Sequence, residues 1–355
     1  MALSLFRCTD FRCLESAELV FSPGHNLIYG PNAAGKTSIL EAIAYLGRAR
    51  SFRGAGNREL VRHGENDFIL FGKATSDNRE TTLGVSNGKS GLEVHTGGEK
   101  RTSAAPLAEA LPLQVVDPDV HDLVAGGPEG RRRYIDWMVF HVEPGYLDQW
   151  RRFRRVLKQR NAALRSPSEG ENLAGWDEEL ATLGNEVDEA RRRIVDIVSP
   201  AVAELGESLL GSAVTIDYAQ GWPSGKSLLD ALRDSTERDL QLASTQAGPH
   251  RADLRLSYDE RQARKLVSRG QQKLLACALI LAATEVVQTH LEKPLLLLLD
   301  DPAAELDGDS VGRLMQAVEQ LGSQVVATTL DPKQALFSDV PTMFHVEHGV
   351  VESAA

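Results

Sequence analysis

The sequence has few cysteines and no long uninterrupted apolar run. Cys8, Cys13 and Cys277 are an odd number without a CxxC pair. This excludes a disulfide scaffold and argues against a zinc site. Uninterrupted apolar runs such as Leu295–Leu299 are far shorter than the roughly 20 residues that cross a bilayer. Arg7 comes too early for a secretory apolar region to form before it. We therefore expect a cytoplasmic protein without a membrane partner.

Positive charge is also in deficit, with 39 Lys and Arg against 50 Asp and Glu and a net charge of −11. This balance argues against a protein that coats DNA as histones do, although a net charge can hide local patches. Residues 128–165 are such an exception, since they hold ten basic and four acidic residues, a local charge of +6. A segment of this kind is a candidate contact for a phosphate backbone.

The alternative for this basic segment is a solvated helix face whose arginines pair with acidic residues of a neighbouring helix. Candidate partners on the following helical stretch are Glu178, Glu179, Glu186, Asp188 and Glu189. The candidate DNA contacts are Arg131, Arg132, Arg151 and Arg155.

The 355 residues, 42 % of them hydrophobic, suit one large core with an insertion or two unequal domains. Apolar spacing predicts a helix at 36–47, a meander of short antiparallel strands at 67–100, and helices over most of 128–210. A break at 166–171 divides the helical region into two long helices, which suggests an antiparallel arm. Further strands are expected at 17–21, 26–29, 214–218, 252–257, 295–299 and 324–329, and a buried helix at 271–284.

A glycine-rich loop between a predicted strand and a predicted helix matches the phosphate-binding pattern GxxxxGK[ST] without a mismatch. Two glycines let the backbone wrap an anion with N–H groups pointing inward, and the helix adds its positive dipole end. The lysine supplies charge for the β- and γ-phosphates of ATP, and the threonine hydroxyl is placed for Mg²⁺. The alternative, a glycine-rich turn with an accidental lysine, is disfavoured by the flanking elements. The candidate nucleotide-binding residues are Gly30, Pro31, Asn32, Ala33, Ala34, Gly35, Lys36, Thr37 and Ser38.

A nucleotide site of this kind needs an acidic residue for the metal, and the run Leu295–Leu299 leads directly into Asp300 and Asp301. Five consecutive apolar residues suit a central parallel strand, whose acids emerge at the carboxyl end beside the phosphate loop. We expect Asp300 to bind Mg²⁺ together with Thr37, and Asp301 to orient the attacking water. A solvated turn after a core strand is the alternative.

The order of the remaining motifs resembles that of ABC-type ATPases. Ser268, Arg269, Gly270 and Gln271 precede an apolar helix, where that class carries a Ser-Gly-Gly-Gln signature that contacts the γ-phosphate held by another subunit. The stretch ending at Asp307 resembles the D-loop, and Thr329 lies where many members have the switch histidine. The alternative for the signature is a simple capped surface helix.

Over essentially its full length the chain resembles the RecF family of SMC-like recombination mediators. The segments that carry this resemblance are 30–42, 51–53, 127–136, 248–251, 268–275 and 300–301. Small departures are Ala252, where an Asp is common, Thr329 in place of the switch histidine, and Asp301 in place of Glu, whose shorter reach suits a slow switch.

The resemblance implies an α/β fold, an ABC-type (SMC-like) P-loop ATPase head with an inserted, mostly helical arm domain. The expected divisions are 1–127 and 213–355 for the head and 128–212 for the arm. It also implies an ATP-dependent homodimer with slow, DNA-stimulated ATP hydrolysis of the kind used by a switch and not by a motor. The dimer would bind single- and double-stranded DNA near gaps and junctions, and with RecO and RecR help to load RecA in gap repair and the SOS response.

Four further residues lie in family-like contexts and have an ordinary structural alternative. Arg12 and Arg53 are candidates for the rim of the nucleotide pocket or for surface ion pairs. Gln114 is a candidate for sensing the metal or for a buried structural amide. His250, with Arg251, could be a structural turn and is no evidence of a metal.

Two other classes of protein fit the sequence less well. A transporter-type cassette would show Ser-Gly-Gly-Gln and a shorter helical insert. A scaffold that uses nucleotide only as a structural ligand is disfavoured by the intact set of Lys36, Thr37 and Asp300.

Overall fold

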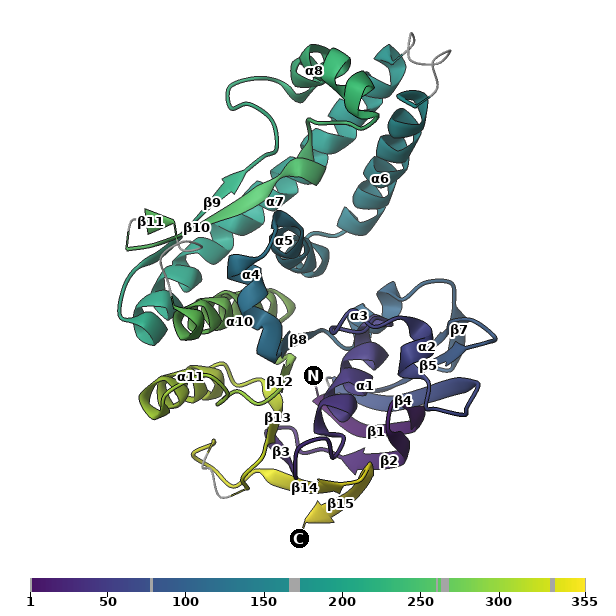
Figure 1. The fold of residues 1–355 in the computed structure, drawn as a ribbon, viewed down its shortest axis with the longest axis vertical. Coiled ribbons are helices and arrows are strands. Elements are labelled where there is room, and N and C mark those ends of the chain that lie inside the picture. Colours follow the sequence, from purple (N-terminus) through teal and green to yellow (C-terminus); the bar gives the residue numbers. More distant parts are fainter. Residues whose placement is uncertain are drawn as a thin grey trace. The chain divides into compact units, whose positions relative to one another are not determined.

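The computed structural model describes residues 2–76, 79–165, 173–259, 261–262, 268–332 and 336–354 (Figure 1). The chain divides into two compact units. The first unit combines Met1–Val120 with Glu292–Ala355, so it is built from both ends of the sequence. The second unit is the continuous segment His121–Leu291.

A largely parallel six-stranded sheet forms the centre of the first unit. Five of its strands run parallel, and only the last strand of the chain pairs antiparallel at one edge. Every residue of the strands 296–299 and 324–329 is buried, which accounts for the four leucines of the first strand and for the apolar residues 325–327 of the second. In spatial order the strands are β15 (Val350–Ala354), β14 (Thr342–Glu347), β3 (His25–Tyr29), β13 (Gln324–Thr329), β12 (Leu296–Leu299) and β8 (Leu113–Val116).

The second sheet of this unit is antiparallel, and α1 (Lys36–Arg48) packs between the two sheets. One core cluster joins Ile43 of α1 to Phe6 and Leu70 of the antiparallel sheet and to Leu298 of the parallel sheet. The antiparallel order is β2 (Leu14–Val20), β1 (Ala2–Phe11), β4 (Asp67–Ser76), β5 (Arg79–Gly88), β6 (Glu93–Thr96) and β7 (Glu99–Arg101).

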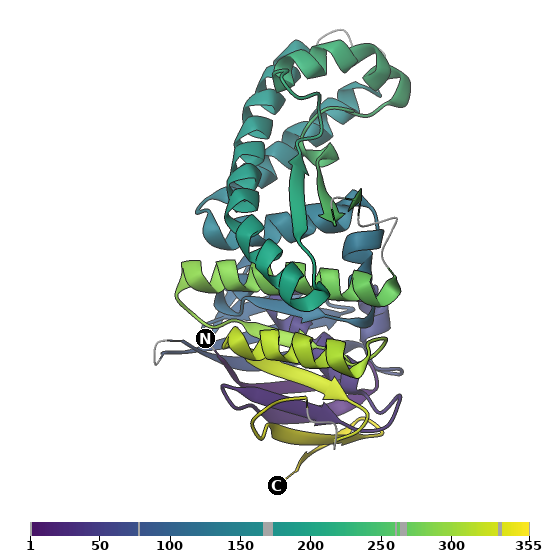
Figure 2. The ribbon, with the colours of Figure 1, turned by 90° about the vertical axis from the view of Figure 1, so that its left-hand side faces the viewer.

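Short helices complete the first unit. Figures 1 and 2 show α11 (Gly308–Gln320) beside β12 and β13, on the side away from α1. The two others are α2 (Asn57–Leu60) and α3 (Ala105–Ala110). A 3₁₀ turn, Pro118–His121, leads out of this unit.

The second unit is built around α7 (Ala174–Leu210), a helix of 37 residues. α6 (Tyr146–Ala163) lies along it, and Ala163, Leu164 and Leu173 pack together where the two helices approach. Figure 2 shows β9 (Val214–Ala219) running beside α7. The remaining elements are α4 (Asp122–Ala125), α5 (Pro128–Val142), α8 (Leu228–Leu242), the 3₁₀ turn Pro249–Arg251, β10 (Asp253–Tyr258), β11 (Arg261–Gln262) and α10 (Arg269–Leu291).

By length and composition alone, α10 could cross a membrane, a possibility that the run Leu295–Leu299 did not reveal. In the structure, 67 % of its most apolar window is buried, and the helix packs against α7. This is the environment of a core helix within a folded unit.

Most of the predicted elements are confirmed. The helix expected at 36–47 is α1, the strand expected at 324–329 is β13, and the meander at 67–100 comprises β4 to β7. The strand β1 and the helices α8 and α11 were not predicted. The expected break at 166–171 lies outside the described residues.

The two compact units differ from the predicted division, which ended the helical segment at residue 212. Residues 213–291 belong to the helical unit because β9 pairs with β10 and also packs on α7. The division into a head and an arm by function stays a prediction.

Candidate functional site

The phosphate loop lies between β3 and α1, and its backbone requires glycine at both ends. A Cβ on Gly30 would lie 2.1 Å from the backbone oxygen of Val346. Gly35 has a φ of +116° and is the N-cap of α1, with the Cys13 sulfur 3.3 Å from where its Cβ would be. Ala33 also has a positive φ, +61°. The loop is therefore a tight local turn that leads into a helix N-terminus.

The ammonium group of Lys36 is held over this loop. Its Nζ donates to the carbonyl oxygens of Gly30, at 2.7 Å, and Pro31, at 2.8 Å. Burial lowers the pKa of Lys36, and the negative charges of Asp301 and Asp300 oppose that shift. A cation and two carboxylates thus face the same loop, as the motifs predicted.

The carboxylate of Asp300 is hydrogen-bonded to the helix that follows the phosphate loop. Its Oδ1 accepts a hydrogen bond from the Thr37 hydroxyl at 3.1 Å and another from the Thr328 hydroxyl at 2.8 Å. Burial raises the pKa of Asp300, and the two hydroxyl groups counteract the rise. The parallel strands β3 and β12 explain this meeting, because their carboxyl ends lie at one edge of the sheet.

Asp301 follows in a left-handed conformation, with a φ of +47°. Its backbone N–H donates to the Thr328 hydroxyl at 2.9 Å. One buried hydroxyl therefore connects the backbone of Asp301 with the carboxylate of Asp300. The sequence predicted Thr329 as a residue of the nucleotide pocket and did not indicate Thr328. Both threonines end the same buried strand, and only the pairing of the strands shows which one contacts Asp300.

Arg12 belongs to an ion pair that the sequence did not predict in detail. Its Nε and Nη2 donate to the two carboxylate oxygens of Glu41, each at 2.9 Å. Glu41 is fully buried in α1 and also accepts a hydrogen bond from Ser51 at 2.5 Å. The Ser51 hydroxyl in turn accepts the backbone N–H of Arg53. The signal for Glu41 was present in the sequence, since a carboxylate on the buried side of a helix needs a cation.

Arg53 is exposed, and its positive charge makes a minor contribution against the rise that burial causes in the pKa of Asp300. Its guanidinium is therefore within electrostatic range of the candidate metal ligand. The Arg12–Glu41–Ser51 chain anchors the segment that carries Arg53, while Arg12 itself is committed to Glu41.

The other three candidates of this unit have structural hydrogen bonds. Gln114 is buried on β8, where its side-chain oxygen accepts from Arg48 at 3.4 Å. Asp307 is the N-cap of α11 and accepts the backbone N–H of Ser310 at 2.8 Å. The Thr329 hydroxyl donates to the backbone oxygen of Asp331 at 3.3 Å. None of these contacts reaches Asp300.

In the second unit, Ser268 caps α10. Its hydroxyl accepts the backbone N–H of Gln271 at 3.3 Å, and its own N–H donates to the Gln271 side chain at 2.9 Å. This reciprocal pair is a capping box. Ser268 and Arg269 are exposed, so this helix N-terminus is presented at the surface of its unit.

The arginines proposed to bind DNA fall into two groups. Arg131 is 5 % exposed, and its Nε and Nη2 donate to Asp253 at 2.7 and 3.1 Å. Arg132 donates to the backbone oxygen of Ala252, and burial lowers its pKa. These two arginines connect α5 to β10 and to Ala252, the residue that precedes it. Their guanidinium groups therefore bind within the unit.

Arg151 and Arg155 instead lie on the exposed side of α6. The basic face of α6, named so from here on, consists of Arg151, Arg152, Arg154, Arg155 and Lys158. Within the part of the chain that the structure describes, only Arg151 of this set has an acidic partner, Asp148 at 3.4 Å. Of the acidic residues proposed as partners, Glu178 pairs with Arg233 and Asp188 with Arg192.

Comparison with known proteins agrees with this arrangement. The family model for the RecF/RecN/SMC N-terminal domain matches residues 2–352. The DNA replication and repair protein RecF of Pseudomonas aeruginosa is 40 % identical, covering 99 % of this chain and 97 % of that protein. The protein of the same name from Shewanella baltica is 38 % identical and covers 99 % of both chains.

Solved structures extend the comparison to the fold. The recombination mediator protein RecF with a bound ATP analogue, described as part of the RecFOR pathway, has a TM-score of 0.87 and 27 % identity, covering 100 % of this chain and 98 % of that one. An Smc head bound to a domain of ScpA has a TM-score of 0.61 at 15 % identity, covering 100 % and 97 %, and shares the fold alone.

The phosphate loop on a parallel sheet, an acidic strand beside it and a capped helix at the signature position define an SMC-like head of the ABC type. Within that class, the match over nearly the whole length is decisive. The chain belongs to the RecF family.

Proposed function

We propose that the chain binds ATP with Mg²⁺ at the phosphate loop and uses it to control binding to DNA. The observation that carries this proposal is the joint placement of Lys36, Thr37 and Asp300 at one edge of the parallel sheet. The loop fits phosphates because its glycines leave room for the backbone N–H groups and Lys36 adds a compact positive charge. The remaining contacts to the nucleotide are assigned to Pro31, Asn32, Ala34 and Ser38.

The donor set also fits Mg²⁺, which prefers oxygen ligands. Thr37 and Asp300 would hold it, and their oxygens are already 3.1 Å apart. A magnesium ion bound there would neutralise charge on the phosphates. Asp301 would orient the attacking water, and its shorter side chain supports slow, switch-like hydrolysis by an enzyme that is not a motor.

Dimerisation would complete the site. The exposed N-terminus of α10 offers Ser268, Arg269, Gly270 and Gln271 to the γ-phosphate of a second copy. ATP would then bridge two subunits, and binding energy would favour association by mass action.

DNA would be held through its phosphates by the basic face of α6. Arg151 and Arg155 stay candidates, whereas Arg131 and Arg132 are better assigned to holding the unit together. A face of exposed cations favours binding through phosphates that is independent of sequence, on single- and double-stranded DNA near gaps and junctions.

The named relatives act in DNA replication and repair, and the solved relative is a recombination mediator of the RecFOR pathway. We therefore assign this cytoplasmic chain to the same process. It would act with RecO and RecR to help load RecA in gap repair and the SOS response.

The test is nucleotide binding by the Lys36→Met variant, measured by calorimetry with Mg²⁺ and a slowly hydrolysed ATP analogue. We expect affinity to fall about 100-fold, since charge-assisted contacts to the phosphates are lost. Lys100→Met, which removes an exposed lysine of the same unit, should bind like the unchanged protein. Tight binding by Lys36→Met would refute the assignment of this loop.

A further inference from the structure

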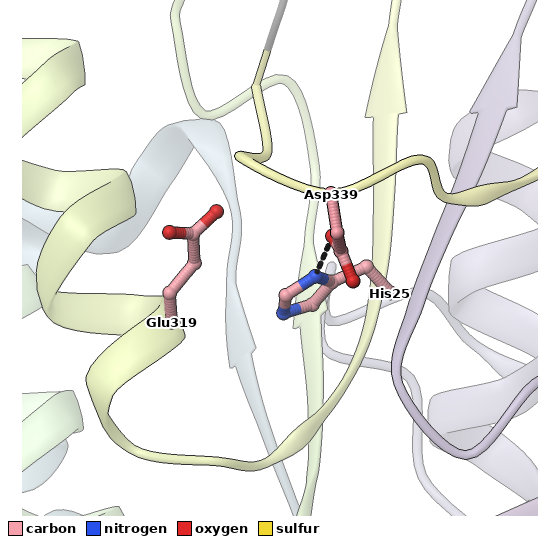
Figure 3. Close-up of side chains that lie close together, drawn as sticks. All are labelled: His25, Glu319 and Asp339. Atoms are coloured by element: carbon pink, nitrogen blue, oxygen red, sulfur yellow. Dashed lines mark hydrogen bonds and ion pairs between the residues drawn. The ribbon is translucent and has the colours of Figure 1, made fainter.

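Three potential metal ligands come together on the first unit, away from every motif that the proposed function uses. They are His25 at the start of β3, Glu319 near the end of α11, and Asp339 in the segment before β14 (Figure 3). One ligand atom from each lies within 4.8 Å of the other two. The Nδ1 of His25 is 2.6 Å from Oδ1 of Asp339.

Neighbouring groups hold two of these side chains in place. The ring of Phe337 stacks on the imidazole of His25, with centroids 4.4 Å apart and planes inclined by 8°. The carboxylate of Glu319 accepts the backbone N–H of Ser338 at 2.6 Å and the Ser338 hydroxyl at 3.0 Å. Hydrogen bonds that orient a ligand in this way are characteristic of metal sites. Each Glu319 oxygen keeps a second lone pair that can bind a cation.

We propose that His25, Glu319 and Asp339 form a binding site for a divalent transition-metal ion, with Zn²⁺ preferred. One imidazole nitrogen and two carboxylates suit Zn²⁺ or Mn²⁺ better than Mg²⁺, which demands six oxygens in a strict octahedron. Two carboxylates around a neutral imidazole leave a charge that a divalent cation would cancel. Bound tetrahedrally at the usual distances, ligand atoms lie about 3.4 Å apart. His25 and Asp339 would therefore separate slightly while Glu319 approaches.

This site is distinct from the proposed Mg²⁺ site with ATP. His25 opens β3, whereas the phosphate loop follows its other end at Tyr29. The register pairs His25 with Val325 at the amino end of β13, while Asp300 and Thr328 lie toward the carboxyl ends. The ion would thus bind at the opposite edge of the sheet and fasten residues 336–339 to α11 and β3. The low cysteine count, which argued against zinc, does not bear on a site of histidine and carboxylates.

The experiment is titration of the nucleotide-free, full-length protein with Zn²⁺ alone, in a Cys13→Ser background that removes the exposed thiol. Asp339→Asn is the principal variant because that side chain is 62 % exposed, so the change leaves the core intact. We expect Zn²⁺ affinity to fall at least about tenfold in Asp339→Asn, and also in His25→Ala. Mn²⁺ should bind more weakly than Zn²⁺ at the same site.

Two controls separate this site from other sources of binding. His95→Ala removes an exposed histidine 4.0 Å from Glu93 and should leave the affinity unchanged. Asp300→Asn disables the proposed nucleotide metal site and should also keep Zn²⁺ binding, so the two proposals can fail separately. If Asp339→Asn and His25→Ala both bind Zn²⁺ like the unchanged background, the proposal is overturned and the three residues form only an ion-pair cluster.

Discussion

At the scale of single residues, the hydroxyl of Thr328 lies between two candidate site residues, the carboxylate of Asp300 and the backbone of Asp301. It donates to Asp300 and accepts the backbone N–H of Asp301, and the side chain is fully buried. A buried hydroxyl that both donates and accepts a hydrogen bond holds its neighbours in place, because rotation of the side chain would break a hydrogen bond that no water could replace. We regard Thr328 as a positioning residue that acts through the two acids.

Replacing Thr328 with valine keeps the shape and removes the hydroxyl. We expect ATP turnover to fall about 10- to 100-fold and the Mg²⁺ requirement to rise, with little change in ATP affinity, as when a group supporting a metal ligand is lost. Thr328→Ser should restore most of the activity. Steady-state kinetics over a Mg²⁺ series provide the measurement.

The adjacent Thr329→Val is the matched control, since its hydroxyl donates to the Asp331 backbone and not to Asp300. A larger loss of ATP turnover in Thr329→Val than in Thr328→Val would contradict this prediction and would favour Thr329, the position that the sequence motif indicated.

At the scale of elements, Arg160 joins three helices of the second unit. Its fully buried guanidinium contacts Asp177 of α7 at 2.7 Å and Asp239 of α8 at 2.6 Å, while the residue itself belongs to α6. Thr245 accepts a further hydrogen bond at 2.9 Å. The same helix therefore carries a buried arginine on one side and the basic face of α6 on the other.

Arg160→Ala leaves two buried carboxylates without their cation. We expect a loss of about 3–5 kcal/mol in the free energy of unfolding, measured by urea denaturation followed by tryptophan fluorescence. Arg151→Ala, an exposed change on the same helix, should alter that free energy by no more than about 0.5 kcal/mol. Equal stability of the two variants would show that the buried network contributes little.

At the scale of the whole molecule, the capped N-terminus of α10 makes dimerisation testable. Ser268→Arg should prevent ATP-dependent association, because a bulky cation would occupy the place of the second copy's γ-phosphate. ATP binding by the monomer should persist. Light scattering after gel filtration, with and without ATP and Mg²⁺, measures the mass.

Ser227→Arg supplies the control for the lost cap. Ser227 caps α8 by accepting the Asp230 backbone N–H, so this variant also loses an N-cap without touching the signature. A Ser268→Arg protein that dimerises with ATP as the unchanged chain does would contradict a role of the signature in trans.

The proposed DNA binding is also tested on the assembled protein. The combined Arg151→Ala and Arg155→Ala change should weaken binding to all DNA sequences alike and flatten the slope of log K against log salt by about 2. Fluorescence anisotropy with gapped duplexes at several salt concentrations measures both quantities.

A second double variant, Arg233→Ala with Arg255→Ala, removes two exposed arginines that pair with Glu178 and Asp217. It should keep the original slope. If both double variants behave alike, the basic face of α6 is not the DNA contact.

The phosphate loop, the helix behind it and the acidic end of β12 could be predicted from the amino-acid sequence alone. These features depend on residues close together in the chain: glycines that permit a tight turn, and an apolar run that must be buried. The meeting of Thr37 with Asp300 also followed from sequence, because parallel strands bring their carboxyl ends to one edge. Alternation of apolar and polar residues did not identify β1. A register shift between Leu3 and Leu5 interrupts the regular alternation of its buried and exposed positions.

Which charged residues are internal could not be predicted from the sequence, because it depends on how distant elements pack. Arg131 and Arg151 belong to the same basic segment, yet Arg131 is buried against Asp253, 122 positions away, while Arg151 stays exposed. The choice of Thr328 over Thr329, the pairing of Arg12 with Glu41 and the approach of His25 to Glu319 and Asp339 have the same origin. A charged or polar side chain is buried only when a partner reaches it, and that partner is supplied by the packing of elements distant in sequence.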